Sequence, residues 1–231
     1  PAATVDKTAY PRQLAQVKPS MASLCLYIGL KDSSENLQLP KTNLWIYPSE
    51  NYEQSIKAFL QDAEQEFPLV YISFPSAKDP SFNARYPDRA TIEIVAPCPW
   101  EWVEQWADKP WGKRGDDYDT LKEQFSQRLL EKLYQKMPHL RGKVDYYELS
   151  TPLSTQFFCW YDKGEIYGLD HDPKRFEQTW LRPKTSIEGL YLTGQDIMTC
   201  GVVGAMIGGL MTAVSVAGVK ALPLAKKIFV G

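Results

Sequence analysis

Cysteine and histidine are scarce in this chain of 231 residues, and neither is spaced as a metal site. The two histidines form no HExxH pattern. The four cysteines lie far apart, and no two form a CxxC pair, which argues against a zinc site or a disulfide framework. We therefore expect no metal ion and reduced, mostly buried thiols. The cysteines are Cys25, Cys98, Cys159 and Cys200.

An excess of charge of either sign is also missing. The formal net charge is -2 at pH 7, which gives no indication of a nucleic-acid partner. The first ten residues lack the basic and then apolar pattern of a signal peptide. They also lack an initiator methionine, and we expect the chain to be a piece of a longer protein.

Hydrophobic periodicity predicts a mixed α/β fold. Hydrophobic residues make up 44% of the chain, enough for one large domain or two small ones. Apolar residues alternate with period two in several short runs, as in half-buried strands, and recur every three or four residues in two longer runs, as in helices. The order β, β, α, β, β, α, β indicates an antiparallel or mixed sheet flanked by helices. The expected strands are residues 22–30, 43–47, 69–74, 91–95 and 143–149, and the expected helices are 51–67 and 116–137.

Tryptophan is concentrated in one stretch, at Trp100, Trp102, Trp106 and Trp111. Four large rings so close in sequence are typical of core packing, which we favour. They can also line a tunnel for a long apolar substrate.

Glycine is concentrated near the C-terminus. Residues 189–218 read GLYLTGQDIMTCGVVGAMIGGLMTAVSVAG, which predicts a short buried strand at 190–193, a turn, and then a helix. The helix would contain Gly201, Gly204, Gly208 and Gly209. Glycine inside a helix costs about 1 kcal/mol relative to alanine, so close approach of another backbone or of a flat ligand is the expected compensation.

Two other interpretations of this segment stay open. Residues 197–219 carry no charge and are numerous enough to cross a bilayer, and Gly204 and Gly208 match the GxxxG packing motif of membrane helices. A tail anchor is therefore one alternative. A buried helix that packs tightly on a sheet and binds no ligand is the other.

Several motifs resemble the phytoene desaturase-like flavoproteins, and within them the branch of carotenoid isomerases and retinol saturases. The match is spread over most of the chain, and its C-terminal motif is the most specific part. The matching segments are GLYLTGQD at 189–196, CGVVGA at 200–205, STPLS at 150–154, GEIYGL at 164–169 and KRGDDYDTLK at 113–122.

The resemblance implies FAD, a two-domain fold, and redox or isomerisation chemistry at the C=C bonds of a polyene isoprenoid such as a carotenoid or retinoid. It implies a protein in the cytoplasm or peripheral to a membrane, because such substrates dissolve in lipid. By position, the ribityl–phosphate part of FAD would lie at Gly194, Gln195 and Asp196, and the flavin ring at Gly201, Val202 and Val203.

An aromatic run precedes the flavin segment and gives candidate substrate contacts. Phe157 and Tyr161 are spaced to share one face of a helix that could reach a flavin. Trp160 and Tyr167 lie beside them in the sequence.

One feature of the family is absent from these residues. The dinucleotide-binding GxGxxG that follows the first strand in such proteins does not occur in the chain. The expected organisation is therefore a substrate-binding domain at 1–149 and the last strand–helix segment of a Rossmann-like FAD-binding domain at 150–231. We expect the isolated chain to bind FAD weakly or not at all and to be inactive. A non-catalytic module that binds an apolar ligand, or a tail-anchored membrane protein, are the alternative functions.

Overall fold

The computed structural model describes residues 9–221, 223 and 226, which group into two compact units. The sheet unit is Met21–Glu165, and the helical unit combines Pro1–Ser20 with Ile166–Gly231. This division by contacts falls at 165/166, whereas the division expected from sequence falls at 149/150.

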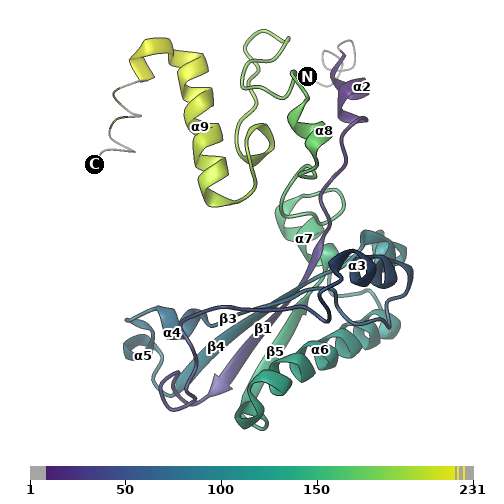
Figure 1. Ribbon diagram of the computed structural model, residues 1–231, viewed down its shortest axis with the longest axis vertical. Coiled ribbons are helices and arrows are strands. Elements are labelled where there is room, and N and C mark those ends of the chain that lie inside the picture. The colour runs from purple at the N-terminus through teal and green to yellow at the C-terminus, as the bar shows by residue number, and fades with distance from the viewer. Residues whose placement is uncertain (1–8, 222, 224–225, 227–231) are drawn as a thin grey trace. The chain divides into compact units, whose positions relative to one another are not determined.

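The strands of the sheet unit form one five-stranded sheet in the order β2-β3-β4-β1-β5, visible in Figure 1. Every neighbouring pair is antiparallel. Each strand expected from period-two alternation is present, so the mixed fold with helices and an antiparallel sheet is confirmed. The strands are β1 (Ser23–Lys31), β2 (Leu44–Ile46), β3 (Val70–Ser73), β4 (Arg89–Pro97) and β5 (Val144–Ser150).

Local residues explain where two helices of the sheet unit begin or end. The long helix starts after Gly115, whose φ of 94° leads into a first turn rich in aspartate, favourable to the helix dipole. The helix expected at 51–67 is shorter. It ends before Asp62, which is extended and whose carboxylate accepts the Glu64 N–H at 2.9 Å. The helices are α3 (Tyr52–Gln61), α4 (Pro75–Lys78), α5 (Phe82–Arg85), α6 (Asp116–Lys136) and α7 (Pro152–Cys159).

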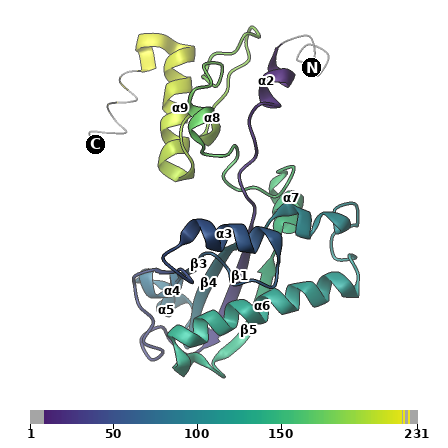
Figure 2. The ribbon, with the colours of Figure 1, turned by 45° about the vertical axis from the view of Figure 1, so that its right-hand side comes forward.

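One face of the sheet carries the core. Alternate residues of β1 and β4, such as Leu26 and Ile94, are fully buried against α3 and α6. Figure 2 shows both helices on the same side of the strands. Full burial of one such side chain contributes roughly 1.5–3 kcal/mol, so this layer is the main source of stability in the unit.

The tryptophan-rich stretch mostly belongs to this core. Trp100 and Trp106 are buried, and Trp102 lies parallel to Phe125 with ring centroids 6.0 Å apart. Trp111 is exposed. Core packing is therefore the role of three of the four rings.

The helical unit is built around α9 (Gly201–Ala217), which starts at the expected glycine. The strand expected at 190–193 was wrong as a strand. A strand needs a hydrogen-bonded neighbour, and within the described part of the chain this run makes a single isolated bridge, between Lys184 and Tyr191. Among those residues, no helix is both long and apolar enough to cross a membrane. The other helices of the unit are α2 (Tyr10–Leu14) and α8 (Pro173–Phe176).

All four thiols are free, but the expectation that most are buried was wrong. Cys98 is buried and Cys25 is partly buried, whereas Cys159 and Cys200 are exposed. Cys159 is the last residue of α7, and Cys200 is the N-cap residue of α9.

Thiol reactivity should therefore separate the cysteines into two classes. Burial raises the pKa of Cys98 to about 12 and that of Cys25 to about 11, and the thiolate is the reactive form. At pH 8 we expect a thiol-specific disulfide reagent to label Cys159 and Cys200 quickly, and the other two only after denaturation. The double variant Cys159→Ser, Cys200→Ser should lose the fast phase; four thiols that react at one rate would contradict this description.

Candidate functional site

Two glycines of α9 let the preceding loop lie directly on the helix. A Cβ atom added at Gly204 would be 1.9 Å from the Thr199 carbonyl oxygen. One added at Gly208 would be 2.2 Å from the Gly194 carbonyl oxygen. Both distances are too short for any side chain. Close packing of the loop backbone therefore explains why glycine, a poor helix former, occurs at these two positions.

Two other glycines of the segment are open. Gly194 and Gly201 have φ of 86° and 88°, a region that L side chains rarely adopt. A Cβ atom added to either would meet nothing within 4 Å. These are the positions at which a ligand can approach the backbone closely.

The loop before α9 is fixed by a buried arginine. Arg175 is only 3% exposed, and its Nη2 donates to the carbonyl oxygens of Gln195 at 2.9 Å and Asp196 at 2.8 Å. It also donates to the Met198 carbonyl at 3.3 Å. Since one guanidinium nitrogen donates to three carbonyl oxygens of the turn, the protein itself holds the geometry of the turn. No local pattern around Arg175 points to this role, because its partners lie about twenty residues later in the chain.

The side chains of the expected ribityl–phosphate residues also hold the loop. Asp196 Oδ1 accepts the Leu169 N–H at 2.9 Å, and Gln195 Nε2 donates to the Ile166 carbonyl at 3.0 Å. Gly168 is required here because a Cβ atom there would be 2.0 Å from Asp196 Oδ1. The GEIYGL and GLYLTGQD segments, both quoted for the resemblance, are thus in direct contact. Of the three residues expected at the ribityl–phosphate part, Gly194 is the one whose backbone a ligand can approach, because a Cβ atom there would meet nothing within 4 Å.

The N-terminus of α9 is exposed, and the Gly201 N–H donates to Gln195 Oε1 at 3.4 Å. Its N-cap residue Cys200 makes no capping bond through its side chain, and its own N–H donates to His171 Nε2 at 2.7 Å. Val202 is 87% exposed and Val203 64%. A helix start presents N–H groups and partial positive charge. With Gly201 open beside it, this end fits a flat group whose edge carries partial negative charge, as the pyrimidine edge of a flavin does.

The expected substrate residues do not share one helical face. α7 ends at Cys159, and Trp160 has a left-handed φ of 62°, so Tyr161 leaves the helix on which Phe157 lies. Trp160 is 91% exposed. Tyr167, also exposed, belongs to the helical unit.

Phe157 instead belongs to an exposed aromatic cluster of the sheet unit. Its ring stacks on Trp111 with centroids 5.1 Å apart. Phe158 meets both rings edge-on, at 4.9 Å from Phe157 and 4.7 Å from Trp111.

The sheet face opposite the core carries aromatic side chains among polar and charged ones, and we call it the open face. Its residues are mostly half-buried or exposed, in contrast to the buried residues between them. Gly29 on β1 leaves a flat place between Thr91 and Tyr146. A glycine inside a strand often marks a close approach of a ligand. One row across the five strands is Trp45, Tyr71, Val95, Cys25 and Ser150, and the next is Ser73, Glu93, Tyr27 and Glu148.

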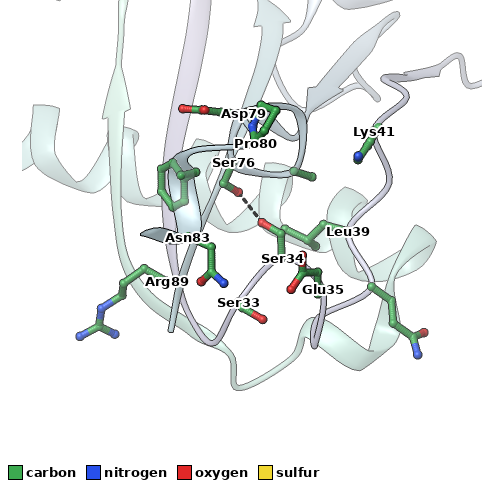
Figure 3. Close-up of a pocket in the computed structure, with 13 residues that line it drawn as sticks. Ser33, Ser34, Glu35, Leu39, Lys41, Ser76, Asp79, Pro80, Asn83 and Arg89 are labelled. Carbon is green, nitrogen blue, oxygen red and sulfur yellow. Dashed lines mark hydrogen bonds between the residues drawn. The ribbon is translucent and has the colours of Figure 1, made fainter. Parts of the chain in front are cut away.

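A cavity of about 430 Å³ lies beside the β1–β2 loop (Figure 3). Ser34 and Ser76 share a hydrogen bond of 2.8 Å within it, and Lys41 and Arg89 also line it. Its hydroxyl and charged lining does not suit a polyene. None of the residues expected from sequence to bind cofactor or substrate lies in it.

Comparison with known proteins gives consistent relatives. No protein-family model matches the chain. The chain is 39% identical over 207 residues to the all-trans-retinol 13,14-reductase of Rattus norvegicus, 37% to that of Homo sapiens, and 34% over 209 residues to that of Danio rerio. Each match covers 87% of the chain but 34% of the relative, so the chain spans about a third of the length of these relatives.

The chain therefore belongs to the phytoene desaturase-like proteins, as the motifs indicated. Within them it falls in the branch of the all-trans-retinol 13,14-reductases. A second Danio rerio relative, 29% identical over 213 residues, is an inactive all-trans-retinol 13,14-reductase. Sequence similarity to these relatives is therefore not sufficient to assign the reductase activity.

Proposed function

We propose that the full-length protein is an FAD-dependent oxidoreductase that acts on C=C bonds of a retinoid-like polyene. The observation that supports the proposal is the exposed start of α9 beside the open glycines Gly194 and Gly201. The relatives, named for the reduction of all-trans-retinol, support the substrate class. When bound, FAD would supply the hydride chemistry, which protein side chains lack.

In this proposal the chain contributes two surfaces. Residues 150–231 supply the last segment of the FAD-binding domain, with Gly194, Gln195 and Asp196 toward the ribityl–phosphate part. Gly201, Val202 and Val203 lie toward the flavin ring.

Residues 1–149 supply the substrate-binding domain, whose open face offers a wall with aromatic side chains among polar ones. Trp45 and Tyr71 pack against each other at its edge, with centroids 4.8 Å apart. A long conjugated chain can lie along such a wall because burial of its apolar area is favourable. We also propose that the substrate contacts Phe157, Trp160, Tyr161 and Tyr167. A retinoid partitions into lipid, so the proposal includes peripheral contact with a membrane.

The same surfaces allow a second function. The inactive relative from Danio rerio favours a non-catalytic module that holds an apolar ligand on the open face without redox chemistry. The two functions differ in whether a flavin is needed for retinoid turnover.

The test compares the full-length protein with the 231-residue chain. We expect the full-length protein to carry about one flavin per polypeptide and to convert all-trans-retinol to its dihydro product. We expect the chain alone, which has no GxGxxG, to hold little flavin and to be inactive. A full-length protein that binds retinol but no flavin would favour the binding module. A chain that holds one equivalent of flavin by itself would contradict the proposed division of the site.

A further inference from the structure

A cavity of about 370 Å³ lies within the helical unit, beside the loop that precedes α9. Residues of α8, of the 181–182 segment, of the loop at 196–199 and of the middle of α9 form its walls. Among the described residues that line it, Asp196 also belongs to the proposed flavin site, whereas Gly194 and Gly201 do not line it. The cavity is therefore a separate place at which a molecule can bind.

Arg175 brings an unbalanced positive charge to the wall of this cavity. Its Nη2 donates to the loop carbonyls, but its Nε and Nη1 are buried and have no hydrogen-bond partner within the described part of the chain. None of the ion pairs found among those residues includes Arg175. Arginine stays charged at physiological pH, and a buried charge that lacks a counter-charge is costly. Binding of an anion beside Arg175 would relieve that cost.

The ring of Phe176 lies beside the guanidinium and is free to turn. Arg175 Cζ is 5.1 Å from the ring centroid, which is a cation–π distance. The ring offers only the partial negative charge of its face, so it compensates the guanidinium less than a full anion would. Phe176 is 50% exposed, and exposed side chains change rotamer within nanoseconds. Rotation of this ring gives an anion access to Arg175.

Arg182 supplies a second guanidinium to the same cavity. Its side chain is exposed, and its Nη1 donates to the Leu181 carbonyl at 2.8 Å. The acidic member of the lining is Asp196, whose Oδ1 already accepts the Leu169 N–H at 2.9 Å. Two guanidinium groups and one carboxylate leave the lining with a net charge of +1. That charge matches a monoanion.

The charge of the whole helical unit also favours an anion. The unit contains ten lysines and arginines against six aspartates and glutamates, although the net charge of the chain is -2. A surface with an excess of one sign attracts ligands of the other. The helical unit is therefore the part of the chain that draws anions.

The rest of the lining is mainly apolar. Pockets of this size typically combine apolar walls with a few polar groups that fix the orientation of the ligand. An inorganic ion would leave such walls in contact with water, whereas an apolar chain would cover them. The lining thus fits a molecule with an anionic head and an apolar body. The apolar lining residues are Phe176, Leu181, Ile197, Met198 and Met211.

We propose that this cavity binds a carboxylate with an apolar chain, with its head at Arg175 and Arg182 and its chain along Leu181, Met198 and Met211. A carboxylate fits because its single charge balances the lining and its two oxygens match guanidinium donors. Since Arg175 also holds the loop at Asp196, the bound carboxylate would stabilise that loop. The inference goes beyond the proposed function, because neither flavin nor retinoid takes part in it.

The first experiment titrates decanoate into the full-length protein, as purified, by isothermal titration calorimetry. We expect saturable binding that is at least tenfold weaker in Arg182→Gln, because a hydrogen bond between charged groups is lost. Arg182→Lys should recover part of the affinity, since it restores the charge. Lys184→Gln is the matched control, because it removes an equal charge from an exposed side chain that does not line the cavity. It should change the Kd less than twofold.

The second experiment separates the head from the chain. 1-Decanol keeps the apolar chain without the charge, and inorganic phosphate keeps an anionic charge without the chain. Each should bind at least tenfold more weakly than decanoate. Decanol that binds as tightly would show that no anion is recognised, and phosphate that binds as tightly would show that the apolar walls play no part; either result overturns the inference.

These titrations are independent of the test of the proposed function. A full-length protein without flavin or without formation of dihydroretinol would overturn the proposed function and leave the decanoate site in place. Absence of saturable decanoate binding, or equal effects of Arg182→Gln and Lys184→Gln, would overturn this inference alone. Circular dichroism spectra that match the wild type would show that the variants are folded. If Arg182→Gln does not fold, Arg182→Lys serves in its place, and a Kd equal to that of the wild type would then count against the guanidinium.

Discussion

Gly204→Ala is expected to lower the free energy of unfolding by about 1–3 kcal/mol, the usual cost of forcing an extra group into a packed site. The added Cβ atom would be 1.9 Å from the Thr199 carbonyl oxygen and 2.5 Å from Thr199 Oγ1. The carbonyl belongs to the backbone and cannot rotate away. The loop must therefore leave the helix, which would also remove the packing of Gly194 on Gly208.

The same substitution at a neighbouring glycine provides the control. A Cβ atom at Gly209 would meet nothing within 4 Å. Gly209→Ala should therefore stabilise α9 by about 0.5–1 kcal/mol through helix propensity alone. Urea unfolding followed by circular dichroism would measure both variants, and limited proteolysis would report release of the loop. Equal effects of the two alanines would show that the loop does not lie on α9 as described.

The strands were predictable because their alternation is local, but their pairing was not. The buried residues of β1 and β4 stand out in the sequence as every second position. Their antiparallel pairing joins Leu26 to Ile94 across more than sixty residues, which no periodicity reveals. The strand expected at 190–193 failed for the same reason, since an apolar run without a neighbour remains a loop.

The candidate site likewise has features that local sequence predicts and features that depend on distant residues. The start of α9 followed from a glycine after a turn, a local signal. The roles of Arg175 and Gly168 depend on the place of Asp196, which is more than twenty residues away. The row that places Tyr27 between Glu93 and Glu148 depends on the register of three strands. The end of α7 was missed because Trp160, a bulky residue, takes the left-handed conformation that usually favours glycine.

Val202→Asp should act in opposite directions on the stability of α9 and on flavin binding. Val202 is in the first turn of the helix, where a carboxylate interacts favourably with the dipole and free N–H groups. We expect the flavin-free protein to gain about 0.3–1 kcal/mol of stability. If the same N–H groups face the electron-rich edge of the flavin, the carboxylate competes for them and repels that edge. We then expect flavin affinity to fall at least tenfold, which corresponds to about 1.4 kcal/mol.

Val202→Asn is the control, because asparagine has nearly the shape of aspartate without its charge. It should shift flavin affinity by less than threefold. Thermal unfolding of the flavin-free full-length protein would measure the first effect, and recovery of free-flavin fluorescence on dilution would measure the second. A variant that merely disturbs the fold would lower stability and affinity together. Equal flavin affinity in the aspartate and asparagine variants would show that this end of α9 does not face the cofactor, and the proposed flavin site would have to be given up.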